Sequence, residues 1–506
     1  MMRVRAWGRA LRMALLAGLG LLAAVPAADA AGIAWQPCST PEQKGFECAK
    51  TEVPLDHGRP RGARIELALI RHRATEPRRR VGTLFYEAGG PAVPGTEFLP
   101  ALAYAGFPAE VRARFDIVSW DPRGVGESTA VRCFDTQSDE NAFFAGALTR
   151  NVDGFPVGPA QMTTWIDRYR AFGERCQQRV GRLLTHVSTV DTVRDLDLMR
   201  RRMGERLLTY VGTSYGTVVG AIYANLFPDR VRAMVLDGVV DSLAWTRPEI
   251  AENGGRFLSG GLRFRSDVES ARTLEAFLDL CGRTDTAHCA FSAGTPEATR
   301  QKFTEMLTRL PVEPTPGQTT YAQAVSGSVR ALYVTANWPA QAEVLQQLWT
   351  QGPAAVPPPA ARDEEQELAI ACGEVPSPPP GDFPSIDAFA QQRSGMVGPF
   401  WAWDYEPCST WPVRSAHRYT GPWNRRTASP VLVIGNTFDP ATPLRGAVVM
   451  SQNLARARLL TVEGYGHTAL LNPSACANRH EARYLISGVL PPPGSRCVQD
   501  TPPFGS

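Results

Sequence analysis

The stretch that decides the fold is LLTYVGTSYG, residues 207–216. Its first half is an apolar run typical of a buried strand, and the residues after it favour a helix that ends at Leu226, before a proline. Between them the pattern Gly-x-Ser-x-Gly has Ser214 at its centre. A turn this sharp strains the serine backbone, needs neighbours without Cβ atoms and presents the hydroxyl as a nucleophile. A glycine-rich chain contains the pattern by chance often enough that its context has to decide.

The second requirement is a histidine, because a serine hydroxyl becomes an effective nucleophile only when an imidazole accepts its proton. Where this turn is catalytic, an acid and a histidine follow the serine in that order, each on a loop after a late strand. His467 lies in GYGH, after the predicted strand 458–462. None of the other six histidines lies in a glycine-flanked loop after a strand downstream of Ser214. We therefore predict His467 as the general base.

A carboxylate must orient this imidazole and stabilise its positive charge. Asp439 follows the predicted strand 431–435 within NTFDP and fits the expected order. Asp237 and Asp241 end an earlier strand, where some proteins with such a serine turn carry the catalytic acid. We predict Asp439 and keep the other two as the alternative.

Two backbone N–H groups should stabilise the oxyanion that the attack creates. One is the amide of Tyr215, at the start of the helix. The other is expected near Gly90 in EAGGP (87–91), after an early strand, with a simple Gly-Pro turn as the alternative. The loop DPRGVGES (121–128) lacks a third glycine in G-x-G-x-x-G spacing, which argues against dinucleotide binding there.

The order of predicted elements indicates an α/β-hydrolase fold with a mostly parallel central sheet flanked by helices. Early strands are predicted at 64–72, 83–86 and 116–120, and a strand–helix–strand unit covers 207–237. Residues 242–427 are helix-like and irregular, and the strand pattern returns after them, so we expect a large, mainly helical cap inserted between late strands. The predicted division is a signal peptide at 1–30, core at 31–241, cap at 242–427 and core again at 428–506.

The first thirty residues are typical of a signal peptide: arginines, an apolar run over 13–25, and Ala28-Asp29-Ala30. We expect cleavage near Ala30 and export to a periplasm or the medium. An uncleaved anchor is the alternative, but the run is shorter than the roughly 20 residues that a spanning helix needs. The net charge of +3 contains no block of like charge, so neither nucleic acid nor a stable membrane anchor is expected. The sequence leaves the oligomeric state open.

All ten cysteines follow the predicted cleavage site, and an even number in an exported chain favours disulfides over catalytic thiols. None has C-x-x-C spacing. Connectivity does not follow from sequence alone. Pairing each cysteine with its neighbour along the chain gives Cys38–Cys48, Cys133–Cys176, Cys281–Cys289, Cys372–Cys408 and Cys476–Cys497.

Several longer motifs resemble the secreted tripeptidyl aminopeptidase branch of the prolyl aminopeptidase-like serine peptidases. They are GTSYGTVVGAIYANLFPDRVRAMVLDGVVD (212–241), DPRGVGES, GNTFDPATP (435–443), GYGHTAL (464–470), AIACGE (369–374) and CSTWP (408–412). The chain departs from the family in a stiffer Gly-Gly-Pro loop, GGPAVPG at 89–95, and in having Gly373-Glu374 after Cys372. The resemblance implies release of short N-terminal peptides through an acyl-enzyme on Ser214, with no metal or cofactor.

An aminopeptidase must recognise a free α-ammonium, which calls for carboxylates in a partly closed pocket. Glu374 is our first candidate, Asp404 and Glu406 are weaker ones, and Trp401, Trp403 and Tyr405 could line an apolar subsite. The expected partners are peptides with a free N-terminus. The main alternative is an exported esterase or amidase acting on small acyl substrates. A third is a binding protein that has lost catalysis, which the complete Ser, Asp and His set disfavours.

Overall fold

The computed structural model describes residues 32–249, 253–353 and 364–505. The predicted signal peptide at 1–30 lies outside the described residues. Among the residues that are described, no helix is both long and apolar enough to cross a bilayer.

A ten-stranded sheet forms the centre of the molecule, in the order β1-β2-β3-β5-β4-β6-β7-β8-β9-β10. The first four strands in this order pair antiparallel, and every pairing from β5 to β10 is parallel. The strands are β1 (Gln36–Pro37), β2 (Glu47–Pro54), β3 (Arg64–His72), β4 (Gly82–Glu87), β5 (Phe115–Trp120), β6 (Leu208–Thr213), β7 (Val231–Asp237), β8 (Val431–Phe438), β9 (Ala457–Tyr465) and β10 (Arg496–Val498). The predicted α/β-hydrolase sheet is confirmed, and β1, β2 and β10 at its edges were not predicted.

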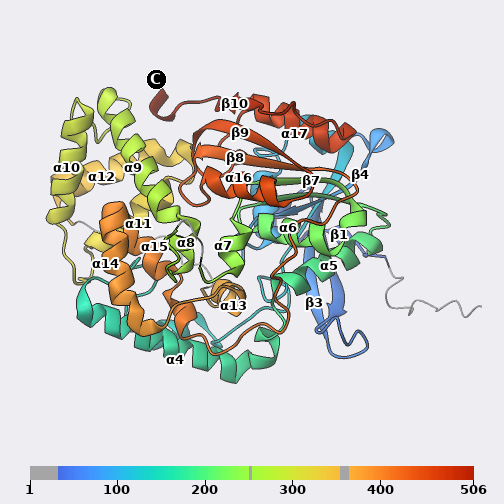
Figure 1. Cartoon of the computed structure of the whole chain (residues 1–506), viewed down its shortest axis with the longest axis horizontal. Helices are drawn as coiled ribbons and strands as arrows, with labels where there is room; N and C mark the ends of the chain where they lie inside the picture. The colour runs from blue at the N-terminus through green and yellow to red at the C-terminus, as the bar shows by residue number, and fades with distance from the viewer. Residues whose placement is uncertain (1–31, 250–252, 354–363, 506) are drawn as a thin grey trace, which may run out of the picture.

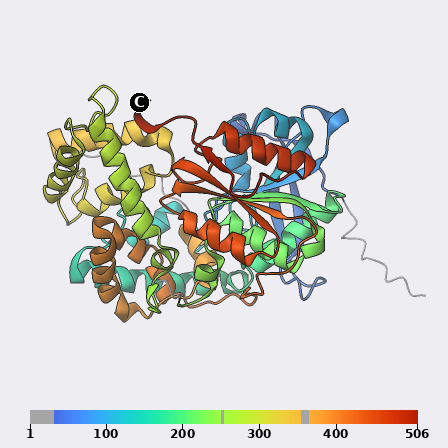
Figure 2. The same cartoon turned by 45° about the horizontal axis from the view of Figure 1, so that its top comes forward.

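Helices cover both faces of this sheet, so each face buries its own apolar core (Figures 1 and 2). One face carries α1 (Gly95–Leu102), α2 (Ala109–Arg114) and α17 (Ala475–Ser487). The other carries α5 (Thr189–Arg202), α6 (Gly216–Leu226) and α16 (Leu444–Asn453). Ser188 is the N-cap of α5, because its side chain accepts the Asp191 N–H.

A mainly helical segment joins β7 to β8 and lies beside the sheet, on the left in Figure 1. Its helices are α7 (Ser242–Thr246), α8 (Gly260–Phe264), α9 (Ser266–Arg283), α10 (Pro296–Thr308), α11 (Tyr321–Ala331), α12 (Trp338–Gln351), α13 (Glu364–Glu374), α14 (Phe383–Ser394) and α15 (Gly398–Asp404). We call these helices the helical block. The boundaries of a separate cap domain at 242–427 stay a prediction.

Two helices from the first half of the chain precede β6, α3 (Gln137–Phe144) and α4 (Gly158–Leu184). The longer one, α4, packs its aromatic side chains on the helical block. The rings of Trp165 and Trp403 lie 6.2 Å apart, and those of Phe172 and Trp411 lie 6.1 Å apart. The helical block and the residues just after it therefore pack on a helix that precedes β6 in the sequence.

Disulfides join all ten cysteines, each to its neighbour along the chain, as the sequence suggested. Cys281–Cys289 ties the end of α9 to the turn after it, Cys372–Cys408 ties α13 to the 3₁₀ turn Glu406–Ser409, and Cys476–Cys497 joins α17 to β10. Such a set of bridges is typical of proteins from oxidising compartments.

Candidate active site

Ser214 lies at the turn between β6 and α6, with a left-handed φ of 56°. A non-glycine residue in this region is strained, as a nucleophile elbow requires. A Cβ atom at Gly212 would collide with the carbonyl oxygen of Gly216, and one at Gly216 would collide with Glu87. The residues around Ser214 are buried while Ser214 itself is half-buried. The turn therefore presents this hydroxyl at the carboxyl end of the sheet.

Asp439 and His467 meet on the loops after β8 and β9. His467 Nδ1 lies 3.0 Å from each carboxylate oxygen of Asp439. The carboxylate is 0% exposed and also accepts the N–H groups of Ala441 and Thr442 and the hydroxyl of Thr442, at 2.9–3.0 Å. A carboxylate held this way keeps the Nδ1 proton in place and leaves Nε2 free to accept a proton.

The end of β7 connects the serine to the histidine. The Ser214 N–H donates to the Asp237 carbonyl at 3.0 Å. A Cβ atom at the next residue, Gly238, would lie 3.2 Å from His467 Cε1. The elbow and the imidazole therefore border the same residues at the carboxyl end of β7.

The two alternative acids have other partners. Asp237 accepts the N–H groups of Ala469 and Leu470 at 3.0 and 2.9 Å, and burial raises its pKa to about 6. Asp241 caps α7 and pairs with Arg445 at 2.7 Å. Of the three carboxylates, Asp439 is the one that contacts His467, and Asp237 instead fixes the loop that follows the histidine.

The loop after β4 lies directly against the elbow. A Cβ atom at Gly89 would lie 2.8 Å from Ser214 Cβ and 3.2 Å from the Tyr215 nitrogen, so only glycine allows this approach. At Gly90 a Cβ atom would lie 2.9 Å from the nitrogen of Ala92. The predicted donors Gly90 and Tyr215 therefore belong to two backbone segments that meet beside Ser214, and their role as the oxyanion hole stays a prediction.

Glu87 contacts both of these segments, and no sequence pattern predicted a role for it. Its Oε2 accepts the Gly89 N–H at 3.1 Å, and it borders Gly216 at the start of α6. Its Oε1 has no hydrogen-bond partner among the described residues. Burial raises the pKa of this carboxyl to about 8, so it carries its proton at neutral pH.

Comparison with known proteins identifies the family of the chain. The family model described as alpha/beta hydrolase fold matches residues 93–291, and that described as TAP-like protein matches residues 394–497. A tripeptidyl aminopeptidase from Streptomyces coelicolor is 30% identical, over 96% of this chain and 88% of its own. Serine protease Hip1 from Mycobacterium tuberculosis is 31% identical, over 92% of this chain and 91% of its own. A carboxylesterase B from the same organism is 29% identical, over 92% of this chain and 89% of its own.

The chain belongs to the tripeptidyl aminopeptidase branch of the α/β-hydrolase serine peptidases. As a member of this branch, it is a serine hydrolase of the peptidase type.

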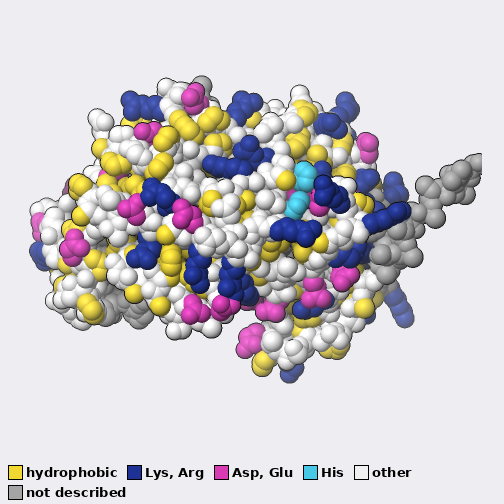
Figure 3. All heavy atoms as spheres, turned by 90° about the horizontal axis from the view of Figure 1, so that it is seen from below, with side chains coloured by type: hydrophobic (Ala, Val, Ile, Leu, Met, Phe, Trp, Pro, Cys, Tyr) yellow, Lys and Arg dark blue, Asp and Glu magenta, His cyan; other side chains and the backbone are white. Residues whose placement is uncertain are grey.

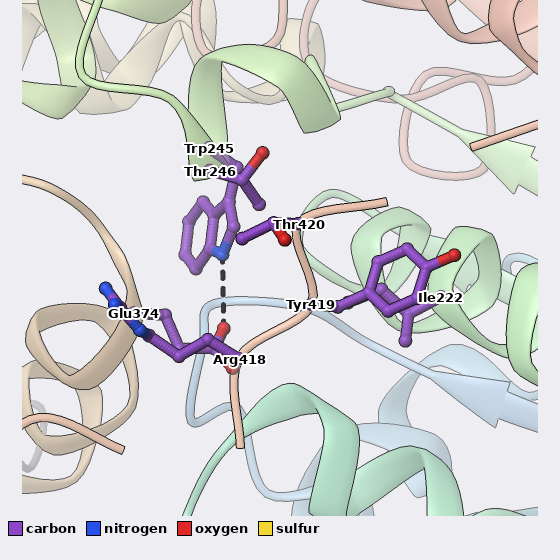
Figure 4. A pocket seen from close by; sticks show the side chains of 7 residues that line it. All are labelled: Ile222, Trp245, Thr246, Glu374, Arg418, Tyr419 and Thr420. Atoms are coloured by element: carbon purple, nitrogen blue, oxygen red, sulfur yellow. Dashed lines mark hydrogen bonds between the residues drawn. The ribbon is translucent and has the colours of Figure 1, made fainter. Parts of the chain in front are cut away.

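In this peptidase Glu374, the candidate for α-ammonium binding, already has protein partners. Its carboxylate accepts the Thr189 N–H at 2.7 Å, the Thr189 hydroxyl at 2.5 Å and Trp245 Nε1 at 3.2 Å. It lines a cavity of about 10 Å³, room for roughly one water molecule, together with Trp245 and Arg418 (Figure 4). Burial raises its pKa to about 6. A peptide terminus could reach Glu374 only if this cavity widened.

The weaker acidic candidates also have partners. Asp404 pairs with Arg150 at 2.8 Å, and Arg150 pairs in turn with Glu367 at 2.6 Å. Glu406 is fully buried, accepts the Ser409 hydroxyl at 2.8 Å, and burial raises its pKa to about 7. Arg150 therefore neutralises one candidate, and the other lies inside the protein.

The aromatic candidates belong to the packing of the helical block. Trp401 is buried and donates through Nε1 to Ser270 at 2.8 Å, and Trp403 is buried and donates to Asp387 at 2.9 Å. The half-buried Tyr405 packs edge-on to Phe264 at 5.8 Å. These contacts are typical of a core, and an apolar subsite at these residues stays a prediction.

The segment between α11 and α12 supports the histidine loop, and the sequence did not predict this support. The His467 N–H donates to the Tyr333 carbonyl at 2.8 Å, and the two rings pack edge-on at 5.1 Å. Asn472 donates to the carbonyls of Tyr333 and His467, and its Oδ1 accepts the Thr335 N–H at 2.9 Å. No sequence pattern marks these residues, because their partners lie up to 139 positions away.

Proposed function

We propose that this protein is an exported aminopeptidase that releases short N-terminal peptides through an acyl-enzyme on Ser214. The observation that carries the proposal is the geometry of His467: Asp439 contacts the imidazole at Nδ1, and the β7 end that binds the Ser214 amide borders the ring at Cε1. Tripeptidyl aminopeptidase and Hip1 as relatives over most of the chain support the peptidase class. The five disulfides support export.

Acylation begins when Ser214 Oγ attacks the carbonyl carbon of the scissile peptide bond and His467 Nε2 takes the hydroxyl proton. The imidazolium that forms is stabilised by Asp439. The N–H groups of Tyr215 and Gly90 would receive the oxyanion, since their segments meet beside the serine. The C–N bond then breaks, His467 gives its proton to the leaving amine, and the N-terminal fragment stays on Ser214 as an ester.

Deacylation repeats the sequence with water in place of the serine. His467 removes a proton from a water molecule, whose oxygen attacks the ester carbonyl, and the proton passes to Ser214 Oγ as the C–O bond breaks. The products are a free short peptide and the regenerated hydroxyl. In both steps His467 carries the proton, between Ser214 and the leaving amine in acylation and between water and Ser214 in deacylation.

The decisive experiment compares peptides that differ only in a free or an acetylated N-terminus. We expect the mature protein to release N-terminal fragments from the free-amine peptides alone. Ser214→Ala is the control, and a fluorophosphonate probe should label the wild type but not this variant. Equal cleavage of both peptide sets would overturn the aminopeptidase assignment, and absence of labelling would indicate a binding protein without catalysis.

Glu374 remains our candidate for recognition of the α-ammonium, and Glu406→Gln is a matched control because it also neutralises a buried carboxylate of the same region. If Glu374 binds the amine, Glu374→Gln raises KM for free-amine peptides and leaves ester hydrolysis unchanged. An equal effect of both substitutions on stability, without an effect on KM, would leave Glu374 with the structural role that its bonds to Thr189 and Trp245 describe.

An esterase is the second candidate, favoured by the carboxylesterase B that is 29% identical over 92% of this chain. The same triad would cleave small acyl esters without recognising an amine. Simple acyl esters are therefore included in the assay. Ester cleavage without any peptide cleavage would establish this alternative.

A further inference from the structure

Two histidines and an aspartate that are not part of the triad gather where the chain returns from the helical block to β8. They are His186, just before α5, Asp191 in the first turn of α5, and His417 in the return segment. One ligand atom from each lies within 4.8 Å of the other two. Asp191 is fully buried, whereas the histidines are partly exposed. Figure 3 shows the underside of the molecule, where histidine side chains reach the surface at one place among basic ones.

The separation of His417 and Asp191 in this group suits a small divalent ion. His417 Nδ1 lies 3.1 Å from Asp191 Oδ1. A tetrahedral zinc ion with bonds of ~2.0–2.1 Å has its ligands roughly 3.3 Å apart, so one ion can bridge these two atoms with little movement. His186 Nδ1 is buried and has no hydrogen-bond partner among the described residues. A buried ring nitrogen of His186 is therefore left without a protein group in the described part of the chain to satisfy it.

The backbone around the group is already fixed. The His186 carbonyl accepts from buried Arg123 at 2.9 Å, and the Ala416 N–H donates to the Thr185 carbonyl at 3.0 Å. Asp191 Oδ2 accepts the Ser188 hydroxyl at 2.8 Å, which leaves Oδ1 facing His417. A hydrogen bond that orients a carboxylate from behind is the usual outer support of a metal ligand.

The local charges permit a cation. Asp191 contributes negative charge to the group. Asp56, which lies near both histidines, contributes a second negative charge. The positive charge of Arg123 is balanced by Asp195 at 2.7 Å. Arg194 lies 3.4 Å from Asp191 Oδ1, half-exposed, and can swing into solvent when an ion arrives.

We propose that His186, Asp191 and His417 bind one divalent transition-metal ion of the zinc type, with water as the fourth ligand. Two imidazoles and one carboxylate select zinc over magnesium, which prefers an all-oxygen octahedron. The other His/Cys group of the described structure, Cys476, His480 and Cys497, does not compete, because its cysteines form a disulfide and offer no thiolate.

The ion would tie the return segment to the core. Residues 411–430 form neither helix nor strand, yet they connect the helical block to β8. Arg418, Tyr419 and Thr420 of this segment line the cavity at Glu374, next to His417. A metal that joins His417 to α5 would therefore fix one wall of that cavity. The proposal does not depend on the substrate, since binding and stability test it directly.

The test uses the mature, disulfide-bonded protein, first freed of metal with a chelator. Zinc binding is measured by equilibrium dialysis, and the midpoint of thermal unfolding is measured with and without zinc. The variants are His186→Gln, His417→Gln and, as control, His288→Gln. His288 is exposed and forms a similar pair with Asp285 at 2.7 Å, but it has no second histidine beside it.

We expect wild type and His288→Gln to share one zinc site and to gain thermal stability from zinc but not from magnesium. His186→Gln and His417→Gln should each weaken that site by at least the roughly 10–100-fold that loss of an outer-shell partner costs. Normal melting without metal and an unchanged zinc-free activity verify folding of both variants. Absence of zinc uptake by the wild type, or a loss in only one of the two variants, would overturn the three-ligand assignment.

Discussion

At the residue scale, the choice of acid can be tested with a matched pair of aspartates. Asp439→Asn leaves an amide that donates toward Nδ1 and favours the wrong imidazole tautomer, so kcat should fall by roughly 10⁴-fold. Asp241→Asn keeps an oxygen that can cap α7 but removes the charge pair with Arg445, so it should leave kcat within a few-fold while it lowers the free energy of unfolding by about 1 kcal/mol. Steady-state kinetics and urea unfolding measure both. Equal kinetic losses would contradict the assignment.

Glu87 gives a second prediction at this scale. Its carboxyl is neutral at pH 7 and loses its proton as the pH passes about 8, which places a negative charge behind the segment that would hold the oxyanion. We expect the kcat of the wild type to fall on the alkaline side, and Glu87→Gln, which stays neutral, to keep its kcat there. Glu463→Gln, on the surface of β9, is the control. Parallel pH profiles for the wild type and Glu87→Gln would refute this role.

At the element scale, the loop after β9 depends on the segment around Tyr333. Asn472 joins the two through bonds to Tyr333, Thr335 and His467. Asn472→Ala should cost about 1–3 kcal/mol of unfolding free energy and also lower kcat, because the imidazole loses its support. Asn225→Ala also removes a buried asparagine with bonds to the main chain, but one that lies outside this loop. It should cost similar stability without the kinetic effect, and a kinetic effect of equal size would contradict the prediction.

The same elements explain what the sequence could predict. Strands β4 to β9 are apolar runs that end in turns, and their parallel order puts their carboxyl ends at one edge, so the loops with Ser214, Asp439 and His467 were expected together. Glu87, Tyr333 and Asn472 escaped notice because their roles come from contacts between distant segments. Glu374 accepts hydrogen bonds from Thr189, 185 residues away, and from Trp245, 129 residues away. No local sequence pattern reveals contacts over such separations.

At the scale of the whole molecule, buried carboxyls should set the pH dependence of stability. Burial raises the pKa of Glu87 and Glu481 to about 8, of Glu269 and Glu406 to about 7, and of Asp121, Asp237 and Glu374 to about 6. Between pH 5 and 8 the folded chain therefore binds more protons than the unfolded chain, and its stability falls as pH rises. The lowered pKa values of His72 and His186 act in the opposite direction, but these are two groups against seven.

We therefore expect the midpoint of thermal unfolding to be several degrees higher at pH 5 than at pH 8, at constant ionic strength and with disulfides intact. Glu481→Gln should reduce this difference, because it removes one of the two carboxyls with the largest shift. A midpoint that rises from pH 5 to pH 8 would show that these carboxyls are ionised in the folded protein.

The five bridges never cross or enclose one another along the chain, since each closes before the next begins. A polypeptide that emerges from an export channel with its N-terminus first can thus be oxidised in step with its emergence. Each new cysteine finds its native partner as the one thiol still free behind it. An oxidant that simply joins consecutive thiols would suffice for such a chain, without an isomerase to reshuffle wrong pairs.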